Sequence, residues 1–230
     1  MSDHPRSNLF NHVKGDVMKK NILMLFVAPA LFCFAVFTHA EEVSDVEKLQ
    51  TRWAEIKYTM PKNEQEKSFA SLIVEAEKSR ALNNSAPNII WEAIIRSTYA
   101  GAKGGLGALD QVKQAKKLFE QAIKLDPQAL DGSAYTSLGT LYYQVPGWPI
   151  GFGDDKQAKS MLLKGLSYNP EGIDSNYFYG DFLLQQKQYA EALKSFEKAL
   201  QAAPRPGREL ADEGRRKEIE AAVSEAKQHL

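Results

Sequence analysis

Apolar residues recur at helical spacing along most of the chain from residue 43 onward. Side chains three or four positions apart lie on one face of an α-helix, so this spacing predicts amphipathic helices. The first two are predicted at 43–58 and 63–81, separated by Met60-Pro61, because proline disfavours helical geometry in the residue before it. Runs of β-branched residues are scarce, whereas Ala, Glu, Lys, Leu and Gln are frequent. The pattern therefore predicts an all-α fold.

Three further pairs of predicted helices share one order of residue types. The second helix of each pair carries a small, a large and a small residue at i, i+4 and i+7, and a proline follows. These positions are Ala115, Phe119, Ala122 and Pro127; Ala158, Leu162, Gly165 and Pro170; and Ala192, Phe196, Ala199 and Pro204. The first helix of the middle pair adds Tyr135, Leu138, Gly139 and Tyr142. This order resembles the tetratricopeptide repeat (TPR), a helix–turn–helix unit of about 34 residues.

The resemblance covers residues 87–204 closely and residues 43–86 loosely. It implies a TPR-like right-handed solenoid of about four helix–turn–helix units over 41–206, because a single unit cannot bury its own apolar face. Two positions depart from the repeat pattern: Ile95 stands in place of a small residue, and Asn176 in place of a large apolar one.

A charged helix is predicted at about 208–229, within a C-terminal segment at 207–230. Its regular apolar positions form one thin stripe, made of Leu210, Ile219, Val223 and Ala226. A helix of this kind covers the exposed end of a repeat stack, and we predict that it is a capping helix. The alternative is that the stripe pairs with a second copy of the chain, which leaves a homo-oligomer open.

Residues 1–40 have the pattern of a secretory signal peptide with an N-terminal extension. The basic segment Met18-Lys19-Lys20 precedes an apolar run at 22–37, and the small residue Ala40 follows. The run has about 16 residues and is short of the ~20 that span a membrane, which is the alternative interpretation. We therefore predict cleavage after Ala40, with Met18 as an alternative start.

Loss of residues 1–40 removes the one cysteine and three of the four histidines, and leaves His229. A zinc site, a Cys–His dyad and a Ser–His–Asp triad are therefore not expected, and we predict no catalytic residue, no metal and no cofactor. The remaining 25 basic and 27 acidic residues nearly balance, which argues against nucleic acid as a partner. The glycine-rich segment 101–107 lacks the Gly-Lys-Ser/Thr ending of a phosphate-binding loop.

The resemblance to TPR proteins implies a concave groove lined by the first helix of each unit. Carrying the inward-facing positions across gives Glu92, Arg96 and Tyr99; Thr136, Thr140 and Tyr143; and Tyr177, Asp181 and Leu184. Tyrosine suits a binding groove because it offers a large apolar area and one hydrogen-bonding group. The alternative is that these tyrosines pack between helices. Arg96 is the one cation of this set, which disfavours the acidic peptide C-termini that some TPR domains clamp.

The connection at 145–153 places Trp148, Ile150 and Phe152 where loops are normally polar. One interpretation is a lid or docking knob beside the groove. The preferred interpretation is that the loop folds back and packs against the helices. Segment 101–107 lies on the same edge of the predicted stack and would pack with it. The string YQVPGWPIGFGDD resembles one group of exported bacterial TPR proteins, which includes the T component associated with periplasmic solute transport (TRAP systems).

These features predict a non-catalytic TPR scaffold that is exported to the periplasm of a Gram-negative bacterium. It would bind a protein or peptide partner in its groove and would retain no integral membrane segment after signal cleavage. The alternative is a solute-binding accessory component of a periplasmic transport system, with a pocket closed by the Trp148 loop. A third hypothesis, a carboxylate-dependent hydrolase, has no motif to support it.

Overall fold

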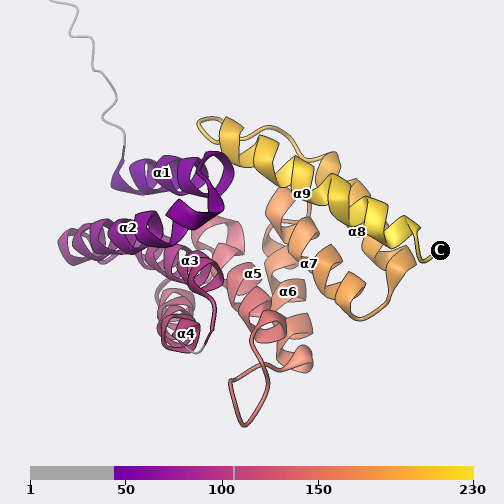
Figure 1. Ribbon diagram of the computed structural model, residues 1–230, viewed down its shortest axis with the longest axis horizontal. Coiled ribbons are helices and arrows are strands. Elements are labelled where there is room, and N and C mark those ends of the chain that lie inside the picture. Colours follow the sequence, from indigo (N-terminus) through magenta and orange to yellow (C-terminus); the bar gives the residue numbers. More distant parts are fainter. Residues whose placement is uncertain (1–43, 106) are drawn as a thin grey trace, which may run out of the picture. The chain divides into compact units, whose positions relative to one another are not determined.

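The computed structural model describes residues 44–105 and 107–230, and the predicted signal segment at 1–40 lies outside the described residues. The described residues form nine α-helices and no β-strand (Figure 1). The helices are α1 (Asp45–Thr59), α2 (Lys62–Leu82), α3 (Ala86–Lys103), α4 (Ala108–Leu125), α5 (Ala129–Gln144), α6 (Asp155–Tyr168), α7 (Ile173–Gln185), α8 (Tyr189–Leu200) and α9 (Glu209–Lys227). The all-α repeat fold is therefore confirmed. No helix among the described residues combines the length and the apolar character that a membrane span requires.

Two helix starts show how the sequence sets the boundaries of the elements. Ser44 begins α1 with a capping box, in which its hydroxyl accepts from the Glu47 backbone N–H and its own N–H donates to the Glu47 carboxylate. Asp154 begins α6, because its carboxylate accepts from the backbone N–H groups of Lys156 and Gln157 at 2.8 and 3.0 Å. These caps satisfy backbone donors that have no partner inside the helix.

Consecutive helices pack as hairpins, and small residues at the crossings allow their close approach. A Cβ atom added to Gly180 of α7 would lie 2.7 Å from the ring of Phe196 on α8, and Phe196 itself is fully buried. A Cβ atom added to Gly139 of α5 would lie 2.8 Å from the side chain of Leu162 on α6. The small and large positions of the repeat pattern therefore meet across each of these hairpins.

The two departures from the repeat pattern have local explanations. Ile95 is fully buried and packs in the cluster formed by α1, α2 and α3, so a large residue fills this crossing. Asn176 is buried and donates its amide N–H groups to the backbone carbonyls of Pro170 and Gly172, at 2.9 and 2.8 Å. Its side chain thus satisfies carbonyls in the turn before α7 instead of filling a core position.

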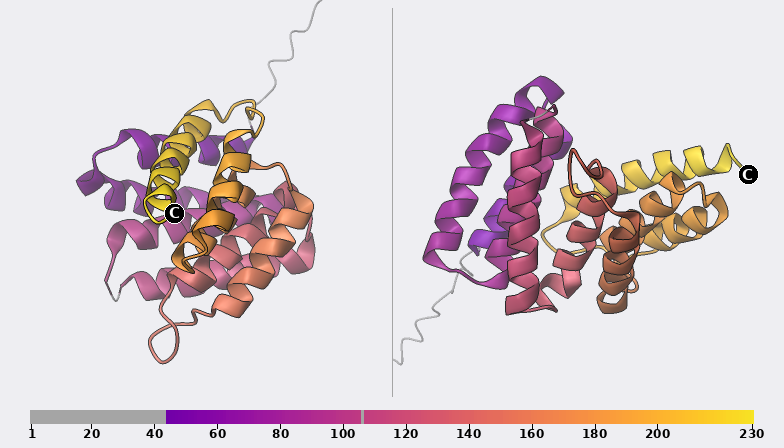
Figure 2. Two further views of the ribbon diagram at one scale, coloured as in Figure 1. Left: turned by 90° about the vertical axis from the view of Figure 1, so that its right-hand side faces the viewer. Right: turned by 90° about the horizontal axis from the view of Figure 1, so that it is seen from below.

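The last helix packs against α7 and α8 and also reaches the first helix (Figures 1 and 2). A Cβ atom added to Gly214 of α9 would lie 2.4 Å from the ring of Tyr58 on α1. The Tyr58 hydroxyl donates to Glu218 at 3.3 Å, and Lys57 lies 3.3 Å from the same carboxylate. Helix α9 therefore packs on the last hairpin and in addition joins α1.

Candidate functional site

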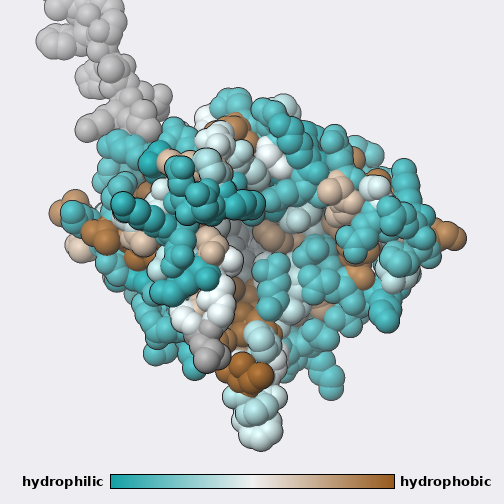
Figure 3. Space-filling view, viewed as in Figure 1, coloured by the Kyte–Doolittle hydropathy of each residue, from teal (hydrophilic) through white to brown (hydrophobic). Residues whose placement is uncertain are grey.

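A cavity of about 1370 Å³ lies between α1, α3, α5, α7 and the first half of α9. In the surface view, a hollow with apolar side chains inside it separates the α1–α4 side from the α5–α8 side (Figure 3). Its volume exceeds the 300–1,000 Å³ that is usual for small-molecule pockets. This cavity is the candidate binding site.

The α1 and α3 wall of the cavity is aromatic. Trp53 and Trp91 meet edge to face, with ring centroids 6.0 Å apart, and Trp53 meets Tyr58 in the same way at 5.8 Å. The Trp53 indole N–H donates to the hydroxyl of Thr98 at 2.9 Å, which fixes the orientation of the ring. Such paired rings provide a rigid apolar surface.

The cavity ends, under the start of α9, at a cluster of ionic side chains. Asp174 of α7 accepts from Arg205 at 2.7 Å and from Arg215 at 2.8 Å. Burial alone would raise the pKa of Asp174, but the two guanidinium groups outweigh burial and hold that pKa well below its usual range. Arg215 also lies over the rings of Tyr177 and Phe178, at 4.3 and 4.6 Å from their centroids. This cluster fixes α9 to α7.

Arg208 differs from the other arginines of this cluster. Its guanidinium lies over the ring of Trp91, at 5.0 Å from the centroid. Within residues 44–105 and 107–230, no carboxylate lies at ion-pair distance from Arg208, and its Nε is buried without a hydrogen-bond partner. The Nε1 of Trp91 is likewise buried and unpartnered in this part of the chain. Burial and the nearby Arg205 both lower the pKa of Arg208.

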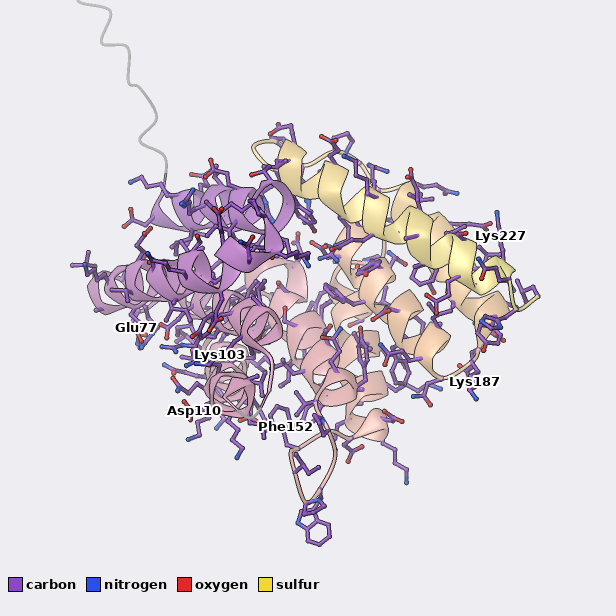
Figure 4. All side chains as sticks on the ribbon, in the orientation of Figure 1. Glu77, Lys103, Asp110, Phe152, Lys187 and Lys227 are labelled. Carbon is purple, nitrogen blue, oxygen red and sulfur yellow. The ribbon has the colours of Figure 1, made fainter. Side chains whose placement is uncertain are left out.

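The opposite end of the cavity lies beside the 145–153 loop and the turn after α3. Ile150 lines this opening and is 59% exposed, whereas Trp148 at the tip of the loop is 90% exposed and lies outside the lining. Phe152 packs edge-on against Tyr142 of α5, with centroids 5.8 Å apart. It lies where the loop meets the helices, and the loop extends beyond it (Figure 4). Phe152 thus packs against the helices, as one interpretation of the loop requires, whereas Trp148 is exposed, as the other requires.

Three of the nine groove residues inferred from sequence line the cavity: Thr136, Thr140 and Tyr177. The three from α3 lie on a neighbouring face of that helix. Glu92 and Arg96 are buried in an ion-pair network with Glu77 and Arg80 of α2, in which Arg96 Nε donates to Glu92 at 2.9 Å.

The other inferred groove residues pack between helices. Tyr99 packs against the core cluster of α1, α2 and α3, and Leu184 is buried in the core cluster of α6, α7, α8 and α9. Tyr143 donates its hydroxyl to Asp181 at 2.6 Å, and its ring packs against Phe182. Burial and the Asp181 carboxylate raise the pKa of Tyr143, and burial raises the pKa of Asp181. This contact joins α5 to α7 beside the cavity rather than inside it.

The aromatic residues of the α1 and α3 wall and the ionic residues under α9 were not among the groove residues inferred from sequence. Trp91 directly precedes the inferred Glu92, so a shift of one residue would have found the correct face of α3. The arginines at 205, 208 and 215 occur in the segment after the last repeat. Their clustering in the sequence was a signal for an ionic site in this segment. Their place in the cavity depends on the contact between α9 and α1, which no local pattern predicts. Among the described residues, no group of side chains is arranged to hold a metal ion.

The comparisons with family models agree with this architecture. Two segments match family models that are both described as Tetratricopeptide repeat: residues 174–206, which cover α7 from its second residue and all of α8, and residues 106–129, which contain α4. The chain thus has an all-α repeat fold in which these two segments match tetratricopeptide repeats. A solved structure titled MamA AMB-1 is similar, with a TM-score of 0.40 and 17% sequence identity over 80% of this chain and 92% of that chain. The search of curated proteins found no match.

Proposed function

We propose that this protein is an exported, non-catalytic TPR scaffold that binds a segment of a partner protein in the cavity on its concave side. The observation that carries the proposal is the cavity itself, which runs along the first helices of the repeats and reaches the 145–153 loop. Tetratricopeptide repeats commonly present a concave surface to a protein partner. The carboxylates Asp174 and Glu218 at the closed end are both held in ion pairs with arginine, which suits a structural role better than proton transfer.

Export to the periplasm is supported by the basic, apolar and small-residue segments at 18–40. N-terminal sequencing of the protein from a periplasmic fraction tests this part of the proposal. We expect the mature chain to begin at Glu41. A chain recovered in the cytoplasm with residues 18–40 intact would contradict it.

A substitution that fills the cavity tests partner binding. Ser137 lies on the cavity side of α5, so Ser137→Trp would place an indole in the space that a partner segment needs. Ser160 is an exposed position of α6 outside the cavity lining, and Ser160→Trp is the matched control. In affinity capture followed by mass spectrometry, we expect one partner to be recovered by the wild type and by Ser160→Trp, and to be lost with Ser137→Trp. Equal recovery by all three chains would contradict binding in the cavity.

A second candidate function is a solute-binding accessory component. It is favoured by the contact of α9 with α1, because this contact closes one end of what would be an open groove. A closed end suits a small solute, which can be enclosed, better than a long chain that must pass through. Titration with candidate solutes, followed by tryptophan fluorescence, tests it, since Trp53 and Trp91 both line the cavity. Absence of any change across the panel would argue against this candidate.

A further inference from the structure

The ionic side chains under α9 are paired, with one exception. Arg205 pairs with Asp174 and Asp212, and Arg215 pairs with Asp174 and Glu218. Among the described residues, Arg208 is the cation of this cluster that has no carboxylate within 4 Å. The closed end of the cavity thus carries one guanidinium that forms no ion pair, although Asp174 and Asp212 are near enough to act on it electrostatically.

The side chain stacked with this cation also offers an unused donor. Trp91 is 4% exposed, lines the cavity, and has a buried Nε1 with no acceptor among the described residues. Arg208 lies against its ring and lines the same cavity. Buried N–H groups nearly always have an acceptor, so two unpartnered donors on stacked side chains indicate a place built for an acceptor.

The chemistry of the two donors indicates what kind of acceptor fits. A guanidinium binds a carboxylate strongly because its N–H groups form charge-assisted hydrogen bonds in a planar fork. The carboxylates Asp174, Asp212 and Glu218 belong to the same cluster and repel added negative charge, which favours a monocarboxylate over a phosphate dianion. The walls beyond this point include the apolar side chains of Ile94, Leu109 and Leu141, and they lead toward the 145–153 loop.

We infer that the Arg208–Trp91 end of the cavity binds the carboxylate of a small organic acid whose aromatic or aliphatic body lies along the apolar walls. The inference rests on the proposed function only in taking this cavity as the binding site. It goes beyond that function because it names a charge-specific subsite and the class of ligand that this subsite takes.

Isothermal titration calorimetry with a matched pair of probes tests the inference. The probes are 4-phenylbutyrate and its neutral amide, 4-phenylbutyramide, which have the same body and differ in charge. We expect the wild type to bind the acid at least about tenfold more tightly than the amide, since a hydrogen bond to a charged group discriminates by this amount or more. We expect Arg208→Gln to remove this preference while leaving the affinity for the amide within about twofold.

Two controls separate this result from a loss of structure. Arg52 is an exposed arginine of α1 outside this cavity, so Arg52→Gln should retain the preference for the acid. Arg208→Lys keeps the charge without the fork, so it should retain a reduced preference.

Three results would overturn the inference: equal affinity for both probes in the wild type, no binding of either probe, or a preference for the acid that survives Arg208→Gln. Displacement of the acid by inorganic phosphate at equal concentration would also overturn it, by showing a general anion site. Partner capture is measured separately. A chain that captures its partner and ignores carboxylates would therefore contradict the inference and leave the proposed function standing.

Discussion

Close approach between helices depends on single small residues. Gly139 and Gly180 occupy corresponding crossings of two hairpins, and a Cβ atom at either position would lie within 3 Å of a neighbouring side chain. Real Cβ atoms do not approach other atoms this closely, so an added methyl group must move its neighbour. The pattern of small and large residues in the sequence therefore indicates which residues meet where two helices cross.

Adding one methyl group at Gly180 should destabilise the fold. We expect Gly180→Ala to lower the free energy of unfolding by about 1–3 kcal/mol, because the buried ring of Phe196 must shift. Gly101 is the matched control: it lies within α3 with no atom within 4 Å of an added Cβ, so Gly101→Ala should raise stability by about 0.5–1 kcal/mol. Urea denaturation measures both. A Gly180→Ala chain as stable as the wild type would contradict the packing argument.

The ion pairs of Asp174 should make stability depend on pH. Its folded-state pKa lies below that of the unfolded chain, so its contribution is complete above about pH 4 and is lost as pH falls through the folded-state value. The side chain is 35% exposed, so solvent screens part of the effect, and we expect Asp174→Asn to cost about 1–2 kcal/mol at pH 7.

Urea denaturation between pH 7 and pH 2 measures this contribution. The difference between wild type and Asp174→Asn should shrink as the solution becomes acidic. Asp45→Asn is the control, because the Asp45–Lys48 pair is largely exposed and should contribute less than about 1 kcal/mol. A constant difference between the two chains over the whole pH range would disprove the electrostatic explanation.

The sequence predicted the cores of the hairpins better than it predicted the cavity. Phe119, Phe196 and Leu162 are buried as the repeat pattern requires, because their contacts lie within one hairpin and are encoded locally. On α3 the inferred face contained Glu92, and the observed cavity face contains Trp91. Successive residues of a helix point about 100° apart, so an error of one position selects another face. Contacts between distant elements decide which face lines the cavity.

At the scale of the element, the 145–153 loop combines two kinds of residue. Phe152 contacts Tyr142 and fixes the base of the loop to α5, whereas Trp148 is 90% exposed. A large exposed apolar side chain beside a cavity is typical of an interaction surface. The loop therefore has a structural base and an exposed tip.

Substitutions at the base and the tip should have different effects. We expect Trp148→Ser to leave the melting temperature within about 1 °C of the wild type, since little of its surface is buried, and to weaken partner capture. We expect Phe152→Ala to cost about 1–2 kcal/mol, because it removes an edge-on aromatic contact and part of a packed surface. Calorimetry and affinity capture measure these two properties. Marked destabilisation by Trp148→Ser would contradict the exposed position of this residue.

At the scale of the whole helical domain, residues 44–230, the first and last helices are in contact. This contact depends on Gly214, where a side chain would collide with Tyr58. We expect Gly214→Val to separate α9 from α1 and to cost about 2–4 kcal/mol through overpacking and loss of the Tyr58–Glu218 hydrogen bond. Urea unfolding followed by tryptophan fluorescence and by circular dichroism tests this. The two curves should coincide in the wild type and separate in the variant; coincident curves in both would contradict it.

An open repeat stack frays from its ends, because a terminal repeat has a neighbour on one side only. Helix α1 would then exchange its amide hydrogens with solvent earlier than the central helices. Here α1 contacts α9 in addition to α2 and α3, so opening either end must also break the interface between α1 and α9. Amide protection in α1 should therefore approach that of α5, and the repeats should open as one cooperative unit.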